Sequence, residues 1–263
     1  GDVAYDRLAA KLKPGQSALL VAGDGAYSFK GSGYVRGGIF DRIELMQDGQ
    51  GLRFTRVVSI DEQYMFTVKD TVANLGTQAI AIAPYGRVER QGVPVDLGKQ
   101  MILHEGAIGA FGSDGKFTTE QVKYKDWAKK PRIEKDSTGG WLGITDKYWL
   151  VSLIPDQGGQ FRSQLRHTSA NGQDRYQVDY TGQPVTIAAG ESTETTNRLF
   201  AGAKQVKLLD AYAEQYGIKN FDLAIDFGWF YFLTKPFFYA LDFFGTLFGN
   251  FGVAILVFTV CVK

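Results

Sequence analysis

Alternating apolar and polar positions run through the middle of the chain, from Leu52 to Leu199. A period of two places every second side chain on the same face of an extended strand, so it predicts strands with one buried face. The segments that show it are Leu52–Ile60, Tyr64–Asn74, Gln78–Arg90, Trp141–Pro155 and Tyr176–Gly190. This region is therefore predicted to consist mainly of β-strands.

Clusters of turn-forming residues separate these segments. They are Asn74–Gly76, Ser113–Gly115, Asn171–Gly172 and Thr181–Gly182. Asn, Asp and Gly suit tight turns because they tolerate positive φ. Short strands at regular spacing indicate an antiparallel sandwich or barrel, and the lack of alternating long helices argues against a parallel α/β sheet.

The pattern changes to a helical period after Ala203. Val206, Leu209, Tyr212 and Tyr216 follow one another at spacings of three and four, which gives an apolar stripe on one face of a helix. Gly217 is a suitable stop. We expect a helix over 203–217 that packs on the sandwich, within a domain spanning 49–220.

The C-terminal part is rich in aromatic residues. Residues 221–244 are too aromatic for a solvated linker, and Asp226, Lys235 and Pro236 interrupt them too often for a spanning helix. They are interpreted as an interfacial amphipathic segment on a membrane surface, with Trp229, Tyr231 and Tyr239 as anchors and Lys235 reaching the headgroups. The alternative is a helix buried in the soluble core.

Residues 245–263 predict the start of a transmembrane helix. The run from Phe243 to Val262 has no charged residue, and a spanning helix needs about 20 mostly apolar residues. A start near Gly249 would place Lys263 about 20 Å into a core about 30 Å thick, where a lysine usually faces a polar cavity. Gly245 and Gly249 form a GxxxG pattern, which predicts either close helix packing or a bend.

Composition and charge exclude several classes of function. The net charge of +1 provides no overall field for nucleic acid. Cys261 is the sole cysteine, which excludes a disulfide framework and a cysteine-based zinc site. The basic stretch Lys123–Arg132 is interpreted as a solvated loop or edge.

Candidate catalytic and ligand motifs are incomplete. Gly23–Gly25 and Gly31–Gly33 do not complete a phosphate-binding loop, and Ile108 stands where a zinc motif starting at His104 needs its second histidine. No nucleophile with a base and no carboxylate pair stands out. We predict no enzymatic activity, no metal and no organic cofactor.

Four stretches resemble the bacterial membrane protein insertase family YidC, in its alphaproteobacterial form. They are Ser59–Asn74, Ser137–Gln157, Asn197–Tyr212 and the region from Phe221 to Lys263, with its Gly-Asn-aromatic-Gly motif at Gly249–Gly252. The resemblance implies an antiparallel β-supersandwich, similar in fold to galactose mutarotases, with a C-terminal helix. It also implies that Lys263 contributes positive charge to a substrate groove.

The same resemblance implies a non-catalytic insertase and chaperone. It would lie in the bacterial inner membrane, with its main domain in the periplasm. Its partners would be nascent inner-membrane proteins, the Sec translocon, SecDF and the lipid bilayer, with no nucleic acid.

Residues 1–48 resemble a different family. Ser28–Gly49 is similar to the periplasmic part of NosR-type regulators, so a fusion near Asp48 is one interpretation. The flavin-bearing threonine motif of those regulators is not recognisable, and flavin is not predicted. A redox-regulatory membrane protein therefore stays an alternative function, which flavin absorbance would support.

A carbohydrate-binding sandwich is a second alternative. Proteins with the fold that the resemblance implies bind sugars, and Trp127, Trp141 and Trp149 are candidates for a stacking platform. Quenching of tryptophan fluorescence by a sugar would support it. Tryptophan on a strand is more often a core residue.

Overall fold

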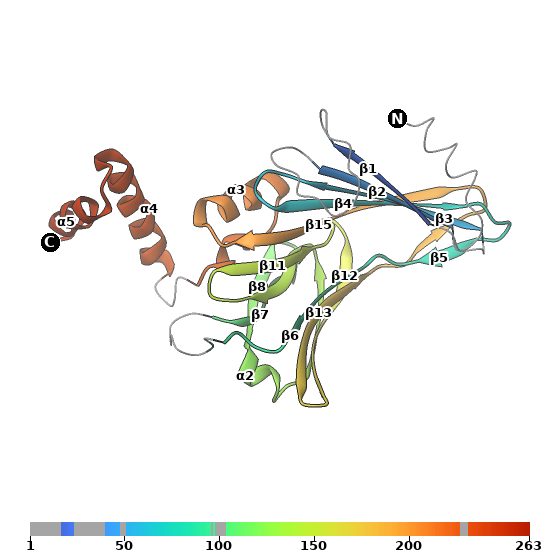
Figure 1. Cartoon of the computed structure of the whole chain (residues 1–263), viewed down its shortest axis with the longest axis horizontal. Coiled ribbons are helices and arrows are strands. Elements are labelled where there is room, and N and C mark those ends of the chain that lie inside the picture. The colour runs from blue at the N-terminus through green and yellow to red at the C-terminus, as the bar shows by residue number, and fades with distance from the viewer. Residues whose placement is uncertain (1–16, 24–39, 48–50, 96, 98–103, 227–230) are drawn as a thin grey trace. The chain divides into compact units, whose positions relative to one another are not determined.

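The computed structural model describes residues 17–23, 40–47, 51–95, 97, 104–226 and 231–263. The chain divides into two compact units (Figure 1). The first comprises residues 1–100 and 104–224, and the second residues 101–103 and 225–263. Each unit is described by itself.

A nine-stranded antiparallel sheet forms the frame of the first unit. Its strands, from one edge to the other, are β1 (Ser17–Gly23), β2 (Phe40–Gln47), β3 (Leu52–Ile60), β4 (Met65–Asn74), β15 (Ser192–Ala203), β11 (Trp149–Ile154), β10 (Trp141–Thr145), β7 (Gly106–Ser113) and β8 (Lys116–Lys123). β15 joins the two halves, because it pairs with β4 on one side and β11 on the other.

A four-stranded sheet covers one face of β7, β10 and β11 (Figure 1). Its order is β6 (Tyr85–Gln91), β13 (Gln173–Gly182), β12 (Gln160–Ala170) and β9 (Arg132–Thr138). Alternate side chains of both sheets meet in the main core, which includes Phe111, Leu142, Leu153, Phe161, Leu165, Val178 and Tyr180. This arrangement is a sandwich, in which each strand buries one face.

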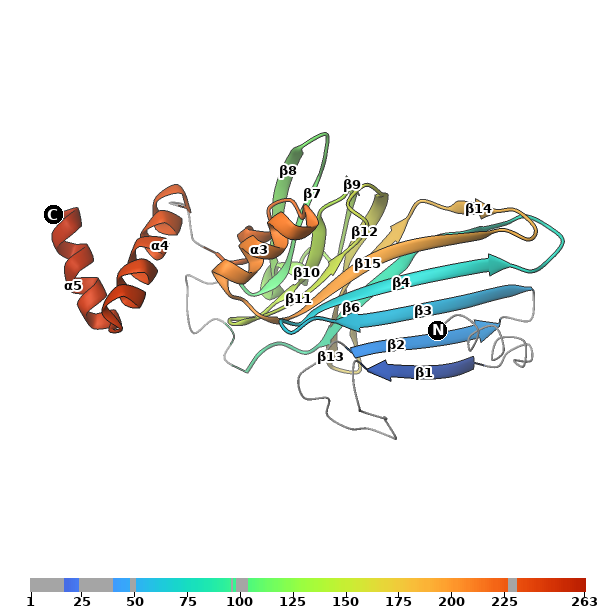
Figure 2. The same ribbon diagram turned by 90° about the horizontal axis from the view of Figure 1, so that it is seen from above.

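A two-stranded ribbon extends the other half of the sandwich, and its strand β14 lies beside β15 (Figure 2). It pairs β5 (Ile80–Ile82) with β14 (Val185–Ile187). Ile187 packs with Leu52 and Val72 in a second, smaller apolar cluster. The ribbon therefore packs on β3 and β4 of the large sheet.

Helix α3 (Val206–Tyr216) and a short 3₁₀ helix η1 (Phe221–Ala224) pack on the large sheet. Leu209 and Tyr212 of the predicted stripe are buried, and Gly217 ends the helix with φ 65°. The Phe221 ring contacts the rings of Trp141 and Phe200, with centroids 5.3 and 6.0 Å away. The predicted helix of 203–217 is present, although it begins at Val206 because residues up to Ala203 still pair in β15.

The mainly antiparallel β-architecture confirms the predicted fold class. β3 has the predicted bounds, and the turns at Ser113–Gly115 and Asn171–Gly172 form hairpins with positive φ at Asp114 and Asn171. The predicted turn at Thr181–Gly182 is wrong. Both residues lie in β13, where Gly182 pairs with Phe161, and the chain leaves the strand after them.

The predicted boundary between residues 48 and 49 falls between two paired strands. β2 pairs with β3 from Phe40 opposite Ile60 to Gln47 opposite Arg53. β1 pairs in turn with β2, so both strands extend the nine-stranded sheet. Most of the stretch that resembles NosR-type regulators lies outside the described residues.

The second unit contains helices α4 (Tyr231–Phe248) and α5 (Phe251–Val262). Two predicted bounds are corrected here. Phe221 and Ala224 are buried in the first unit and not on a surface segment, because Phe221 completes an aromatic cluster. Gly245 lies inside α4, and the bend falls at Gly249–Asn250.

Among the helices that the structure describes, none combines the length and apolar character needed to cross a membrane.

Candidate membrane-contact surface

Polar side chains form one stripe along α4. Lys235, Tyr239, Asp242 and Thr246 follow at spacings of four, three and four residues, which places them on one side of the helix. Most of the other positions in α4 are apolar and many are aromatic. α4 is therefore amphipathic, as an interfacial helix must be.

α5 packs against α4 through small residues and aromatic rings. Ala254 is buried, and the rings of Phe237 and Phe258 meet edge to face with centroids 5.0 Å apart. A β-carbon added at Gly245 would lie 3.1 Å from the Phe251 ring, so glycine at this position allows the close approach. The close-packing interpretation of the GxxxG pattern applies to Gly245.

Gly249 and Asn250 reverse the chain between the two helices. Gly249 has φ 62°, a left-handed conformation that glycine adopts at low cost. The Asn250 side chain caps α5 by accepting hydrogen bonds from the backbone N–H groups of Gly252 and Val253, at 2.8 and 3.3 Å. The bend is thus fixed by one backbone conformation and one side chain.

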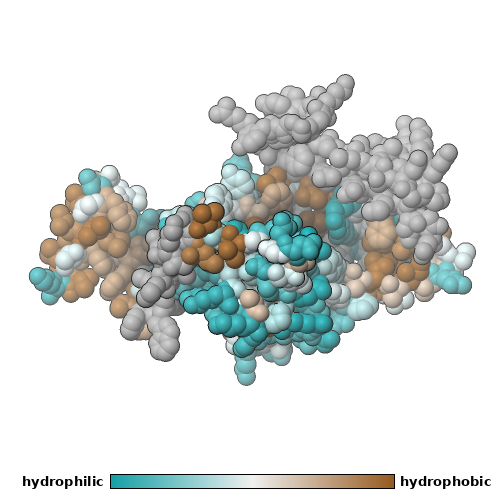
Figure 3. Space-filling model, turned by 60° about the horizontal axis from the view of Figure 1, so that its bottom comes forward, coloured by the Kyte–Doolittle hydropathy of each residue, from teal (hydrophilic) through white to brown (hydrophobic). Residues whose placement is uncertain are grey.

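The outside of the α4–α5 hairpin exposes large apolar side chains (Figure 3). They include Phe232, Leu233, Phe243, Leu247, Phe251, Ile255, Leu256 and Val260, and Val260 is 77% exposed. A soluble monomer rarely exposes apolar residues so densely, so such a surface marks a binding partner or a membrane. α5 is apolar on all sides, which is typical of a helix surrounded by lipid or protein.

The residues predicted as membrane anchors lie in or next to α4. Trp229 lies outside the described residues, and Tyr231 begins the helix. Lys235 is half-buried, Tyr239 is 37% exposed, and the two are one turn apart on the polar stripe. Lys263 follows α5 directly and is exposed, with its backbone N–H donating to the Thr259 carbonyl at 3.2 Å.

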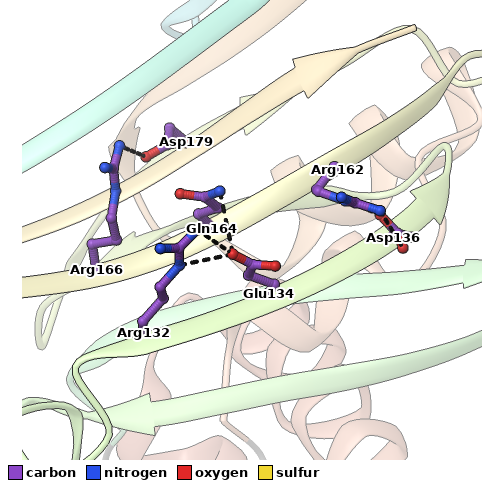
Figure 4. Close-up of polar contacts among 7 residues, drawn as sticks. All are labelled: Arg132, Glu134, Asp136, Arg162, Gln164, Arg166 and Asp179. Atoms are coloured by element: carbon purple, nitrogen blue, oxygen red, sulfur yellow. Dashed lines mark hydrogen bonds and ion pairs between the residues drawn. The ribbon is translucent and has the colours of Figure 1, made fainter.

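Charged side chains on the four-stranded sheet pair with one another (Figure 4). Arg162 donates to Asp136 at 2.8 Å, and Arg166 donates to the buried carboxylate of Asp179 at 3.0 Å. The hydrogen bond from Arg162 holds the pKa of Asp136 below its usual value. These carboxylates are ion-pair partners in a polar sheet face, and no acid–base pair emerges from them.

The two histidines are engaged in separate local contacts. His104 Nε2 lies 2.8 Å from the Ala107 carbonyl, and His167 Nε2 lies 3.1 Å from Asp174. His167 lies within β12. In the part of the chain that the structure describes, no group of three or more His, Cys, Asp or Glu side chains is arranged to hold a metal ion.

The tryptophans proposed as a sugar platform do not share a surface. Trp127 and Trp141 are 0% exposed, whereas Trp149 is 62% exposed. Trp127 lies in the short helix α2 (Tyr124–Trp127), inside the stretch interpreted as a solvated loop. That interpretation is wrong for its aromatic residues, which enter the main core, while its lysines are exposed.

Sequence reasoning missed a cleft beside the β5–β14 ribbon. Its cavity of about 300 Å³ is lined by Phe54, the Arg56–Asp70 ion pair, Tyr85 and Val185, among other residues. These residues come from β3 and β4 of the large sheet, β6 of the four-stranded sheet and β14 of the ribbon, so the packing of three sheets forms the cleft. Apart from the alternation of each strand, the sequence carries no local signal for the cleft.

A family profile describing the YidC periplasmic domain matches residues 41–240. The membrane protein insertase YidC of Allorhizobium ampelinum is 48% identical over 235 residues, which cover 81% of this chain and 38% of that protein. Those of Rhizobium etli and Brucella suis are each 48% identical over 214 residues, covering 81% of this chain and 35% of each relative. The chain thus spans well under half the length of these curated relatives.

Solved structures give weaker similarities. A galactose mutarotase related enzyme from Lactobacillus acidophilus is 8% identical, with a TM-score of 0.40 over 64% of this chain and 70% of that one. A galactose mutarotase-like protein from Lactobacillus casei is also 8% identical, with a TM-score of 0.39 over 62% and 69%.

The profile begins in β2, covers β3 to β15 and α3, and ends in α4. The three relatives named above are each 48% identical to this chain over the aligned residues. The chain therefore belongs to the family of YidC periplasmic domains.

Proposed function

We propose that this chain is the periplasmic part of a membrane protein insertase and chaperone, together with the segment that joins it to the membrane. The α4–α5 hairpin carries the proposal, because a sandwich of this family is followed by helices whose outer apolar side chains are exposed. The relatives are named as membrane protein insertases. The complete protein would lie in the bacterial inner membrane, with the sandwich in the periplasm.

The role is physical and not chemical. An insertase lowers the cost of moving a hydrophobic segment from water into lipid, which requires surfaces and no covalent step. Its partners would be nascent inner-membrane proteins, and it would work alone or beside the Sec translocon and SecDF. We propose no metal, no organic cofactor and no enzymatic turnover.

α4 would lie along the periplasmic membrane surface. Its polar stripe would face water and headgroups, with Lys235 extended toward phosphate and Tyr239 holding its hydroxyl in the interface. Trp229 and Tyr231 would add anchors at its start. α5 would enter the hydrocarbon, where its uniformly apolar surface is stable.

Lys263 would place a positive charge inside the membrane region. α5 is 12 residues long, about 18 Å at the helical rise, so Lys263 would lie well inside a core about 30 Å thick. A lysine at that depth is costly unless it faces a polar groove. We assign it to such a groove, where it would attract acidic parts of an inserting chain.

The experiment replaces Lys263 with glutamate in the complete insertase that contains this chain, in cells depleted of other copies. We expect K263E to slow insertion of a dependent client, while K263R retains it. A charge-matched control, K116E, changes an exposed lysine on β8 and should leave insertion unchanged. Normal insertion with K263E would refute the groove role, and no dependence of any inner-membrane protein on the complete protein would refute the insertase function.

A further inference from the structure

Several strand ends of the nine-stranded sheet meet at one rim of the sandwich. Thr145 pairs with Gly106, which pairs with Lys123, so β10, β7 and β8 reach the same edge. Trp149 pairs with Ala203, the last residue of β15. Figure 2 shows the turn between β3 and β4 on this same side, near α3.

Aromatic and basic side chains lie at these strand ends, and all of them except the half-buried Lys147 are exposed. We call this group the strand-end rim; it consists of Tyr64, Tyr148 and Trp149 with Lys123, Lys125, Lys130 and Lys147. Tyr64, Tyr148 and Trp149 are 58%, 62% and 62% exposed. Lys147 lies over the Tyr148 ring, with its Nζ 4.8 Å from the centroid.

One exposed aromatic residue of the rim, Tyr64, has an unusual backbone conformation. Tyr64 has φ 70°, a conformation that bulky residues rarely adopt. Asp61 fixes this turn by accepting from the backbone N–H groups of Gln63 and Met65, both at 2.9 Å. The buried Tyr212 hydroxyl donates to the same carboxylate at 2.6 Å, so α3 supports the strained turn.

The charge of the rim favours an anionic partner. Lys123, Lys125 and Lys130 form no ion pair within the described residues, although Lys129 pairs with Asp126 at 3.1 Å. The nearby carboxylate of Asp146 is occupied by Arg90 and by the Tyr124 hydroxyl. Glu62 and Glu105 also lie at these strand ends, so the lysines are in excess and are not the sole charges.

We propose that the strand-end rim contacts the surface of an anionic lipid bilayer. Tyr and Trp are the residues that settle at a membrane interface, where the ring is buried and the polar atom stays wet. Lysines beside them are attracted electrostatically to anionic headgroups. This attraction falls off within about a Debye length of the membrane surface. The inference extends the proposed function, because it brings the sandwich itself to the bilayer that α4 and α5 would enter.

Brominated lipid tests this contact in the full chain. The W229F variant removes the tryptophan next to α4 and leaves Trp127, Trp141 and Trp149, of which Trp127 and Trp141 are buried. The chain is reconstituted into vesicles of phosphatidylcholine and phosphatidylglycerol with bromine on the upper acyl carbons. We expect partial quenching of the emission, and we expect the added substitution W149F to abolish that quenching.

Two lysines on one strand provide a matched comparison of charge. Lys116 and Lys123 stand at opposite ends of β8, about 23 Å apart at the rise of a strand, and both are exposed. We expect K123E, in the W229F background, to reduce the quenching and K116E to leave it unchanged. Removing phosphatidylglycerol should reduce the quenching as well.

The outcomes separate this inference from the proposed function. Flotation of the chain with the vesicles reports the membrane attachment of α4 and α5. Bound chain whose Trp149 is not quenched would overturn the rim contact and leave the proposed attachment intact. Quenching that is equally affected by K116E and K123E would also overturn it, because the effect would then follow net charge and not position.

Discussion

At the residue scale, Asn74 links three segments of the sandwich through one buried amide. Its Nδ2 donates to the carbonyls of Gln78 and Ile187, at 2.8 and 3.0 Å, and its Oδ1 accepts from the Gly76 N–H at 3.0 Å. The side chain is fully buried, so no solvent can replace these contacts. One residue thus closes the turn after β4 and fixes β14 of the ribbon to it.

We expect N74A to destabilise the sandwich by about 1–3 kcal/mol, because it leaves the buried Ile187 carbonyl without this donor. The shift in the urea midpoint measures it. Q78A is the control, since the exposed Gln78 contributes its backbone carbonyl and keeps it when the side chain is shortened. Equal midpoints for N74A and the unchanged chain would contradict this role.

At the element scale, α4 stabilises a helix, α5, that is too short to be stable alone. α5 has 12 residues, which is marginal for an isolated helix in water. α5 is stabilised by its cap at Asn250 and by its packing on α4 through Gly245, Ala254 and Phe258. The hairpin is therefore held by close approach at a few positions, and it is sensitive to volume there.

Gly245→Val should loosen the hairpin, since its first added carbon already comes within 3.1 Å of the Phe251 ring. The test uses a chain in detergent that carries C261S and new cysteines in place of Phe237 and Phe258. The rate at which these two cysteines form a disulfide reports how closely α4 and α5 approach. We expect G245V to slow this reaction roughly five-fold or more, as overpacking by about 1–3 kcal/mol implies. T246V, at the next and exposed position, should react at the original rate, and an unchanged rate for G245V would refute the packing role.

Elements that depend on local pattern could be predicted from the sequence, and those set by pairing could not. β3 was predictable because its side chains alternate over its full length. Gly182 resembles a turn residue, yet it pairs in β13, since a distant partner, Phe161, decides its conformation. The same limit applies to the rim, where Tyr64, Lys123 and Trp149 come together because of the strand order.

At the scale of the whole sandwich, the four-stranded sheet packs on one face of the large sheet and α3 with η1 on the other, and this buries several tyrosines. Tyr124 and Tyr180 belong to the main core, and Tyr212 lies between α3 and the sheet. Burial raises the pKa of all three hydroxyls, and the hydrogen bond to Asp61 raises that of Tyr212 further. The sequence pattern places these tyrosines at apolar positions, but it does not predict that their hydroxyl groups are buried.

These raised pKa values predict loss of stability in alkali. Below the ordinary tyrosine pKa, about 10, both the folded and the unfolded chain keep the proton, so stability does not depend on these groups. Above it, the unfolded chain ionises first while the folded chain holds the proton at higher pH. The free energy of unfolding therefore falls as pH rises beyond about 10, with each such tyrosine contributing about 1.4 kcal/mol per pH unit.

Urea midpoints at about pH 8 and about pH 11 measure this loss. Y180F keeps the ring in the core and removes one ionising group. We therefore expect the free energy of unfolding of Y180F to fall less steeply above about pH 10, by the contribution of one tyrosine. Y85F is the control, because Tyr85 is 52% exposed. An equal decline in Y180F and Y85F would mean that the buried hydroxyl ionises in the folded sandwich as easily as in the unfolded chain. The main core would then be open to hydroxide at this position, contrary to the packing of Tyr180 against Phe161 with ring centroids 5.7 Å apart.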